Sequence, residues 1–128
     1  MGFRANAFGS SALHVYPVRP GMAEGARALV AELMGPRRGE WAESKRRRGI
    51  GRVAMSLVHE DGRDLFVTAV QGSAPVAGVA ALAGSEDPFD VWLRGRMTEL
   101  FEEPLAVEHL ADTAPRPGPW RGMRRFSR

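Results

Sequence analysis

The stretch RVAMSLVHEDGRDLFVTAVQ, residues 52–71, decides the fold of this chain. Asp61 and Gly62 lie between two runs of strand-forming side chains, and Asp-Gly in that setting is the signature of a tight β-hairpin. The pattern predicts strands over residues 52–60 and 64–71. Alternate residues of a strand point to opposite faces, and both faces of this hairpin are largely apolar. We therefore expect both faces of the sheet to be covered.

Periodicity predicts the elements on either side of the hairpin. Alternating apolar residues indicate a strand before it, and apolar residues spaced by three or four indicate helices before and after it. The predicted elements are a strand over residues 12–18 and helices over 22–34, 37–48, 74–83 and 88–103. Ser73 is the expected cap of the third helix. The order strand, helix, strand, strand, helix predicts an α+β fold with a ferredoxin-like antiparallel sheet and helices on one face.

The segment SEDPFDVW, residues 85–92, marks the start of the last predicted helix. Asp87 can cap a helix whose first residue is Pro88, and Asp90 stands where a carboxylate can accept from free backbone N–H groups. Capping explains Asp90 better than a role as a catalytic acid. Apolar side chains then recur at helical spacing and form one stripe: Phe89, Trp92, Leu93, Met97, Leu100 and Phe101.

Composition excludes several classes of protein. The 128 residues predict one domain over residues 12–111, a flexible leader over 1–11, and a Pro- and Arg-rich tail over 112–128 that could end in an edge strand at 120–126. No cysteine is present, so disulfides, thiolate catalysis and cysteine-ligated metals are excluded. The sequence has no apolar run of the roughly 20 residues that a membrane helix needs. We expect a cytoplasmic protein that binds no membrane.

Arginine is clustered in two parts of the chain, although the formal net charge is only +3. One cluster lies in residues 37–48 and the other in residues 116–128. Cations at the end of a predicted helix suit the helix macrodipole, and no aromatic residues alternate with the basic run at residues 45–48 in a way that would stack bases. Nucleic acid is therefore not the expected partner.

An apolar sheet face that the chain's own helices leave open needs a second cover. The economical cover is another copy of the chain, so we expect a two-fold homodimer in which two sheets face each other. The space between the sheets, or between sheet and helices, is then a natural pocket for a ligand.

Three segments carry a resemblance to known proteins: VYPVRPG (residues 15–21), GPRR followed by Glu40, and SEDPFD followed by Trp92. They resemble a family of small, mainly actinobacterial proteins of the dimeric α+β-barrel type, a superfamily that includes the antibiotic-biosynthesis monooxygenases. The resemblance covers about residues 12–103. It implies the fold more than the activity, because the superfamily includes oxygenases, isomerases, cyclases and haem proteins.

Candidate site residues lie mainly on the predicted sheet. His14 and Tyr16 share a strand face, where a histidine could act as general base on an acidic phenol or β-dicarbonyl and a tyrosine could orient its oxygen. His59 could line the same cavity from the second strand. The expected wall of the pocket and its polar groups are Trp41, Arg52, Met55, Phe66, Thr68, Phe89 and Trp92. No close spacing of His and carboxylate residues indicates a metal site, and no cofactor is expected.

Two hypotheses from different classes follow. The first is a cofactor-independent enzyme of secondary metabolism: an oxygenase, cyclase or isomerase that acts on an aromatic or polyketide-like molecule by His-assisted deprotonation. The second is a non-catalytic ligand-binding or structural dimer, in which His14 is a hydrogen-bonded sheet residue and the aromatic stripe is core. A cavity that both His14 and Tyr16 open into would favour the enzyme.

Overall fold

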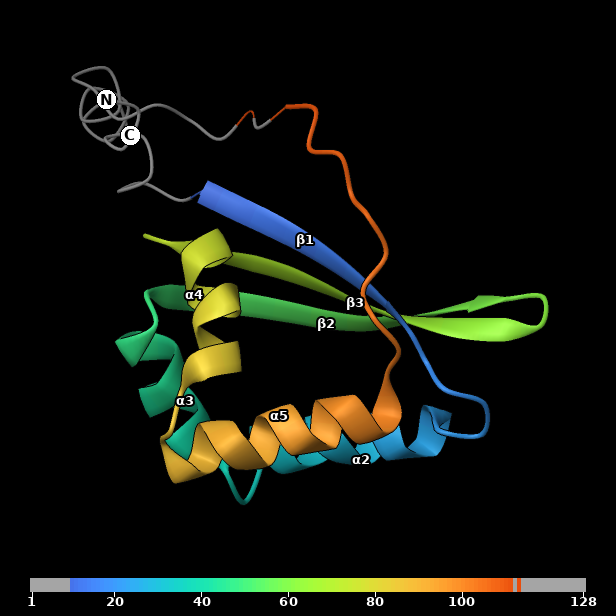
Figure 1. Cartoon of the computed structure of the whole chain (residues 1–128), viewed down its shortest axis with the longest axis horizontal. Helices are drawn as coiled ribbons and strands as arrows, with labels where there is room; N and C mark the ends of the chain where they lie inside the picture. Colours follow the sequence, from blue (N-terminus) through green and yellow to red (C-terminus); the bar gives the residue numbers. More distant parts are fainter. Residues whose placement is uncertain (1–9, 112, 114–128) are drawn as a thin grey trace, which may run out of the picture.

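The computed structural model describes residues 10–111 and residue 113. It is an α+β fold in which a three-stranded antiparallel sheet packs against helices (Figure 1). The elements in chain order are β1 (Ser10–Pro17), α2 (Ala23–Met34), α3 (Arg38–Arg47), β2 (Ile50–Glu60), β3 (Arg63–Gly72), α4 (Pro75–Ala81), the 3₁₀ helix η1 (Leu82–Gly84) and α5 (Pro88–Leu100). The predicted α+β class is confirmed. Residues 1–9 of the predicted leader and the strand predicted at 120–126 lie outside the described residues.

The predicted hairpin is present and forms the larger part of the sheet. β2 and β3 pair antiparallel around a turn in which Gly62 has a φ of 84°, a left-handed conformation that glycine adopts without strain. β1 pairs antiparallel with the other edge of β3, so the strand order is β1-β3-β2. β1 and β2 therefore run parallel to each other, with β3 between them.

The register separates the sheet into an inner and an outer face. The inner face consists of the rows Ala12–Val70–Val53, His14–Thr68–Met55 and Tyr16–Phe66–Leu57. Helices α2, α3 and α5 lie on this side of the sheet in Figure 1, and their buried residues form one core with Phe66. The outer face is apolar and only partly buried, since Leu13 is 47% exposed and Val58 is 42% exposed.

The chain after α5 runs beside β1. α5 ends at Leu100, earlier than the predicted end at residue 103. Phe101 forms an isolated antiparallel bridge with Val18, and the N–H of Glu102 donates to the carbonyl of Pro17 at 2.8 Å. Residues 101–104, called the exit segment below, therefore border the space between the sheet and the helices.

The start of α5 confirms one predicted cap and corrects another. Asp87 accepts from the N–H of Phe89 at 3.0 Å, as a cap should. The prediction that Asp90 binds backbone N–H groups is wrong. Its carboxylate accepts instead from the hydroxyls of Ser44 and Ser85, at 2.5 and 2.6 Å. The N–H of Asp87, which a capping box would direct to Asp90, donates to the Ser85 hydroxyl at 3.3 Å.

The predicted cap of α4 is also wrong. α4 begins at Pro75, whose missing N–H suits the first turn of a helix, and Ala74 at the cap position makes no side-chain hydrogen bond. Ser73 donates to the carbonyl of Gly49 at 3.5 Å. This contact joins the loop before β2 to the loop after β3.

Candidate functional site

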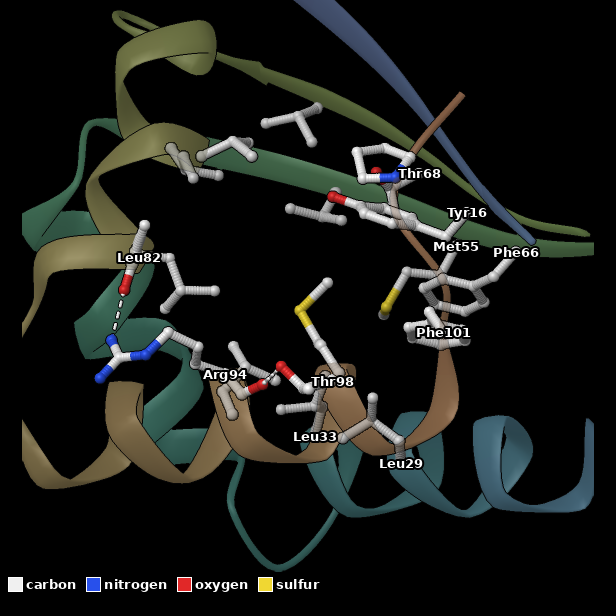
Figure 2. Close-up of a pocket in the computed structure, with 18 of the residues that line it drawn as sticks. Tyr16, Leu29, Leu33, Met55, Phe66, Thr68, Leu82, Arg94, Thr98 and Phe101 are labelled. Atoms are coloured by element: carbon white, nitrogen blue, oxygen red, sulfur yellow. Dashed lines mark hydrogen bonds between the residues drawn. The ribbon is translucent and has the colours of Figure 1, made fainter. Parts of the chain in front are cut away.

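A pocket of about 290 Å³ lies between the inner face of the sheet and the helices. Figure 2 shows the sheet residues Tyr16 and Met55 on one side of it and the α5 residues Arg94 and Thr98 on the other. Most of the wall is apolar: Leu29, Leu33, Val53, Met55, Phe66, Val79, Leu82, Leu93, Met97 and Phe101. The volume is at the small end of the range for ligand pockets, so the pocket suits a small organic molecule.

Two hydroxyl groups interrupt this apolar wall on the sheet side. Tyr16 and Thr68 both line the pocket, and neither hydroxyl forms a hydrogen bond with another described residue. Burial raises the pKa of the Tyr16 phenol, which therefore stays protonated at neutral pH and can donate a hydrogen bond. The two hydroxyls can orient a polar atom of a bound molecule.

An aromatic group fixes the Tyr16 end of the pocket. Phe101 of the exit segment stacks on Phe66 with ring centroids 4.6 Å apart and an interplanar angle of 12°. The ring of Tyr16 lies 5.7 Å from that of Phe101. Such contacts add about 0.5–1.5 kcal/mol each beyond the burial of their area. They hold the exit segment against the sheet and so define this end of the pocket.

His14 lies beside Tyr16 but is not among the residues that line the pocket. The two rings stack with centroids 6.2 Å apart and an interplanar angle of 16°. The Nδ1 atom of His14 is buried and has no hydrogen-bond partner among the described residues. Burial lowers the pKa of His14 below 6.5, so its imidazole is neutral at neutral pH. The histidine predicted to be the general base is thus a neutral imidazole that stacks on the ring of Tyr16 and does not line the pocket.

Replacing His14 with phenylalanine should remove a pH dependence of stability. The unfolded chain binds a proton at His14 near pH 6.5 and the folded chain only at lower pH, so the free energy of unfolding falls as pH falls below 6.5. Urea unfolding at about pH 7.5 and about pH 5.5 should show a smaller difference for His14→Phe than for the wild type. The matched control is His109→Phe, because His109 is exposed. Equal differences in all three proteins would contradict the burial of a neutral His14.

The other predicted sheet residues lie away from this pocket. His59 is exposed near the end of the hairpin, where its Nδ1 lies 2.8 Å from a carboxylate oxygen of Asp64, and it borders a second, more open pocket with Met55. Arg52 is exposed on β2 and does not line either pocket. Within the described residues, no group of three or more His, Asp or Glu side chains is placed to bind a metal ion.

The predicted aromatic wall is divided between the pocket and the interface of α3 with α5. Trp41 lines the pocket, and its ring lies 6.4 Å from that of Phe89. Phe89 in turn packs against Trp92 at 5.5 Å, and the guanidinium of Arg37 lies 4.0 Å from the Trp92 ring. Phe89 and Trp92 do not line the pocket and serve as packing between the helices.

Several residues of the pocket were not among the predicted site residues. Arg94, Met97, Thr98 and Phe101 line it from α5 and the exit segment. Their spacing of three or four residues places them on one face of the helix, and Leu93 begins the same face. The helical period of α5 could therefore have identified them as one side of the pocket. Arg48 lines the pocket from the end of α3, and its position in a run of basic residues gave no such signal.

A buried carboxylate network joins α3 to α5 beside the pocket. Asp90 is only 1% exposed, and besides the hydroxyls of Ser44 and Ser85 it accepts from Arg47 at 3.5 Å. Ser44 also accepts from the Nε of Arg48 at 3.1 Å, which connects the network to the pocket lining. Burial raises the pKa of Asp90, but the Ser44 and Ser85 hydrogen bonds and the charges of Arg47 and Arg48 outweigh it and hold the pKa below its ordinary value.

No protein-family model, curated protein or solved structure matches this chain. None of the helices in the described ranges is both long enough and apolar enough to cross a bilayer. The α+β fold and the pocket described above are therefore the basis for a proposal about function.

Proposed function

We propose that this protein binds a small aromatic or otherwise mainly apolar molecule in the pocket between the sheet and the helices. One observation carries the proposal: an apolar pocket of about 290 Å³ contains two hydroxyl groups that bond no other described residue. Protein interiors are close-packed, so an apolar space of this size between sheet and helices is available to a ligand. The two hydroxyls that face it have donor and acceptor capacity that no described residue uses, and a bound molecule can use it.

Filling the pocket from the sheet side should abolish binding without unfolding the protein. Val53 lines the pocket from β2, and Val53→Phe places a larger apolar side chain into the empty volume. We expect at least a tenfold loss of affinity for an aromatic probe such as naphthamide, which corresponds to about 1.4 kcal/mol, measured by calorimetry. The control is Val58→Phe on the outer face of the same strand, which should leave affinity unchanged. Equal affinity in both variants, or no aromatic probe bound by the wild type, would contradict the proposal.

We further propose a ferredoxin-like topology and a dimer of the α+β-barrel type for this chain. The strand order β1-β3-β2 with α2 between β1 and β2 supports this topology, as does the exit segment, which runs antiparallel to β1 where a fourth strand would lie. The second copy would cover the outer face, on which Leu13, Val15 and Val67 lie. Light scattering should give twice the monomer mass of 14.0 kDa, and Leu13→Arg should give the monomer. A wild-type monomer at micromolar concentration would contradict the dimer.

Proton abstraction in the pocket is a second candidate function, favoured by the neutral imidazole of His14 next to Tyr16. His14 would take a proton from an acidic C–H of the bound molecule, and the bonding electrons would move onto an oxygen that accepts a hydrogen bond from Tyr16. This is the first step expected of a cofactor-independent oxygenase, cyclase or isomerase acting on a polyketide-like molecule. The step requires the substrate to reach past the ring of Tyr16, because His14 does not line the pocket.

Hydrogen exchange tests this candidate without knowledge of the natural substrate. The acidic C–H of benzoylacetone, an aromatic β-dicarbonyl, should exchange with deuterated water faster in the presence of the wild type than in buffer. His14→Phe should lose this acceleration and still bind naphthamide. Acceleration that persists in His14→Phe would assign the proton transfer to another group, and no acceleration by the wild type would leave binding as the function.

A further inference from the structure

Two arginines, Arg48 and Arg94, lie at one end of the pocket and form no direct ion pair with a described residue. Arg94 donates from Nη1 to the carbonyls of Leu82 and Ser85, at 2.7 and 3.0 Å. Arg48 donates from Nη1 to the carbonyl of Gly78 at 2.8 Å. Both side chains are partly buried, and neither forms an ion pair with another described residue. This end of the pocket, next to α4 and η1, is called the basic end below.

Neutral carbonyls satisfy the N–H groups of a guanidinium but do not balance its charge. Asp90, which Arg48 reaches through the Ser44 hydroxyl, offsets the charge of Arg48 in part, and no described carboxylate forms an ion pair with Arg94. Desolvation of an unpaired charge is unfavourable, which is why buried charges are normally paired. Burial lowers the pKa of Arg48, and the nearby Arg47 lowers it further, whereas Asp90 raises it. By contrast, Arg27, Arg63 and Arg96 outside the pocket each pair with a carboxylate three residues away in the chain. The arginines without ion pairs at the basic end therefore create a site that favours an anion.

The opposite end of the pocket has a different charge. In Figure 2, Arg94 and Leu82 lie at one end, and Tyr16 and Phe101 lie at the other. Glu102 and Glu103 of the exit segment line the pocket next to Phe101, together with Arg19. The two carboxylates outnumber the single cation there, so an anionic group is disfavoured at this end and favoured at the basic end.

We propose that the occupant of this pocket is an apolar acid, whose ring or chain lies against the apolar wall and whose carboxylate or comparable anionic group lies at the basic end between Arg48 and Arg94. This inference rests on the proposed binding function and names the class of ligand. An apolar body with one terminal anion matches the wall, the free donors of the two guanidiniums and the charge difference between the two ends. The other explanation of the two arginines is that they only hold the carbonyls of α4 and η1 in place.

A pair of probes that differ in charge but little in shape separates these explanations. The affinities of naphthoate and naphthamide for the wild type are measured by calorimetry at low and at high salt. We expect naphthoate to bind at least about tenfold more tightly at low salt, and only its affinity to fall as salt is added. Arg48→Gln and Arg94→Gln should each remove most of this preference. Arg52→Gln removes the same charge from an exposed position outside the pocket and should keep the preference.

Each outcome bears on a defined part of the proposal. Equal affinities for naphthoate and naphthamide in the wild type would overturn the anionic ligand class but leave the pocket as a binding site. Failure of both probes to bind would contradict the binding function as well. Naphthamide affinity reports whether a variant keeps its pocket. Where Arg94→Gln or Arg48→Gln loses its fold, the affinities of the wild type for naphthoate and naphthamide at low and high salt decide whether the pocket prefers an anion.

Discussion

Replacing Asp90 with asparagine is expected to lower the free energy of unfolding by about 3 kcal/mol near neutral pH. The carboxylate is 1% exposed and holds the hydroxyls of Ser44 and Ser85 together with the guanidinium of Arg47. Asparagine has one acceptor oxygen in place of two, so it leaves a buried donor unpaired and the nearby arginine charge unbalanced. Urea unfolding followed by circular dichroism measures the loss.

The same substitution should change the pH dependence of stability. The pKa of Asp90 is held below 3.8, so the stability that its ionised form contributes is fully present above that value and is lost as pH falls through the lower, folded-state pKa. The difference in free energy of unfolding between the wild type and Asp90→Asn should therefore be smaller when unfolding is repeated at about pH 3. The control is Asp61→Asn at the exposed hairpin turn, where asparagine is equally favourable. If the difference in free energy of unfolding between the wild type and Asp90→Asn does not change with pH, the result would contradict an ionised Asp90.

Gly78→Ala is expected to displace α4 and to lower the free energy of unfolding by about 1–3 kcal/mol. A Cβ atom at this position would lie 2.3 Å from the backbone oxygen of Arg48 and 2.8 Å from Cγ1 of Ile50. The backbone oxygen of Arg48 cannot move without shifting the junction between α3 and β2, and the Ile50 side chain is buried. Because α4 carries part of the pocket wall, binding of an aromatic probe should weaken along with stability.

Gly95→Ala is the matched control for this clash. Gly95 lies in α5 and is exposed, and a Cβ atom added there would meet nothing within 4 Å apart from its chain neighbours and the backbone of its own helix. Alanine at this position should therefore raise stability by about 1 kcal/mol through its helix propensity. The two substitutions are chemically identical and both fall in helices, yet we expect Gly78→Ala to lower the free energy of unfolding and Gly95→Ala to raise it. A stabilising Gly78→Ala would contradict the close approach of α4 to the α3–β2 junction. Thermal unfolding of both variants gives the comparison.

The fold was largely predictable because its signals are local. The Asp61-Gly62 turn and the alternation on either side of it define the hairpin, and Asp87 with Pro88 defines the start of α5. The faces of Tyr16 and Phe66 follow from the alternation of each strand, whereas their position opposite each other depends on the register of β1 against β3, which alternation restricts only to steps of two residues. The end of α5 was predicted too late, because the helix gives way to the bridge between Phe101 and Val18, which lies just after β1 and far from α5 in the sequence.

The candidate site was predictable mainly where strand alternation determines it, and Trp41 on α3 is the predicted helical residue that also lines the pocket. Alternation assigned Tyr16, Met55, Phe66 and Thr68 each to a face of its own strand, their residue types made them candidates for the site, and all of them line the pocket. Asp90 was misread because a carboxylate in the first turn of a helix usually caps it, and only the tertiary structure brings the Ser44 hydroxyl within reach. The spacing of residues in the sequence likewise could not show that Arg48, at the end of α3, and Arg94, on α5, lie at the same end of a pocket.

The central claim, that this pocket binds a small apolar molecule, is tested most directly by the methyl groups of its methionines. Met55 and Met97 line the pocket, whereas Met22 and Met34 are exposed on or beside α2 and do not. In protein labelled with ¹³C at the methionine methyl groups, ring currents of bound naphthamide should shift the signals of Met55 and Met97 in a saturable way. The signals of Met22 and Met34 should stay in place. Saturable shifts confined to Met22 and Met34, or no shift in any of the four signals, would contradict the claim.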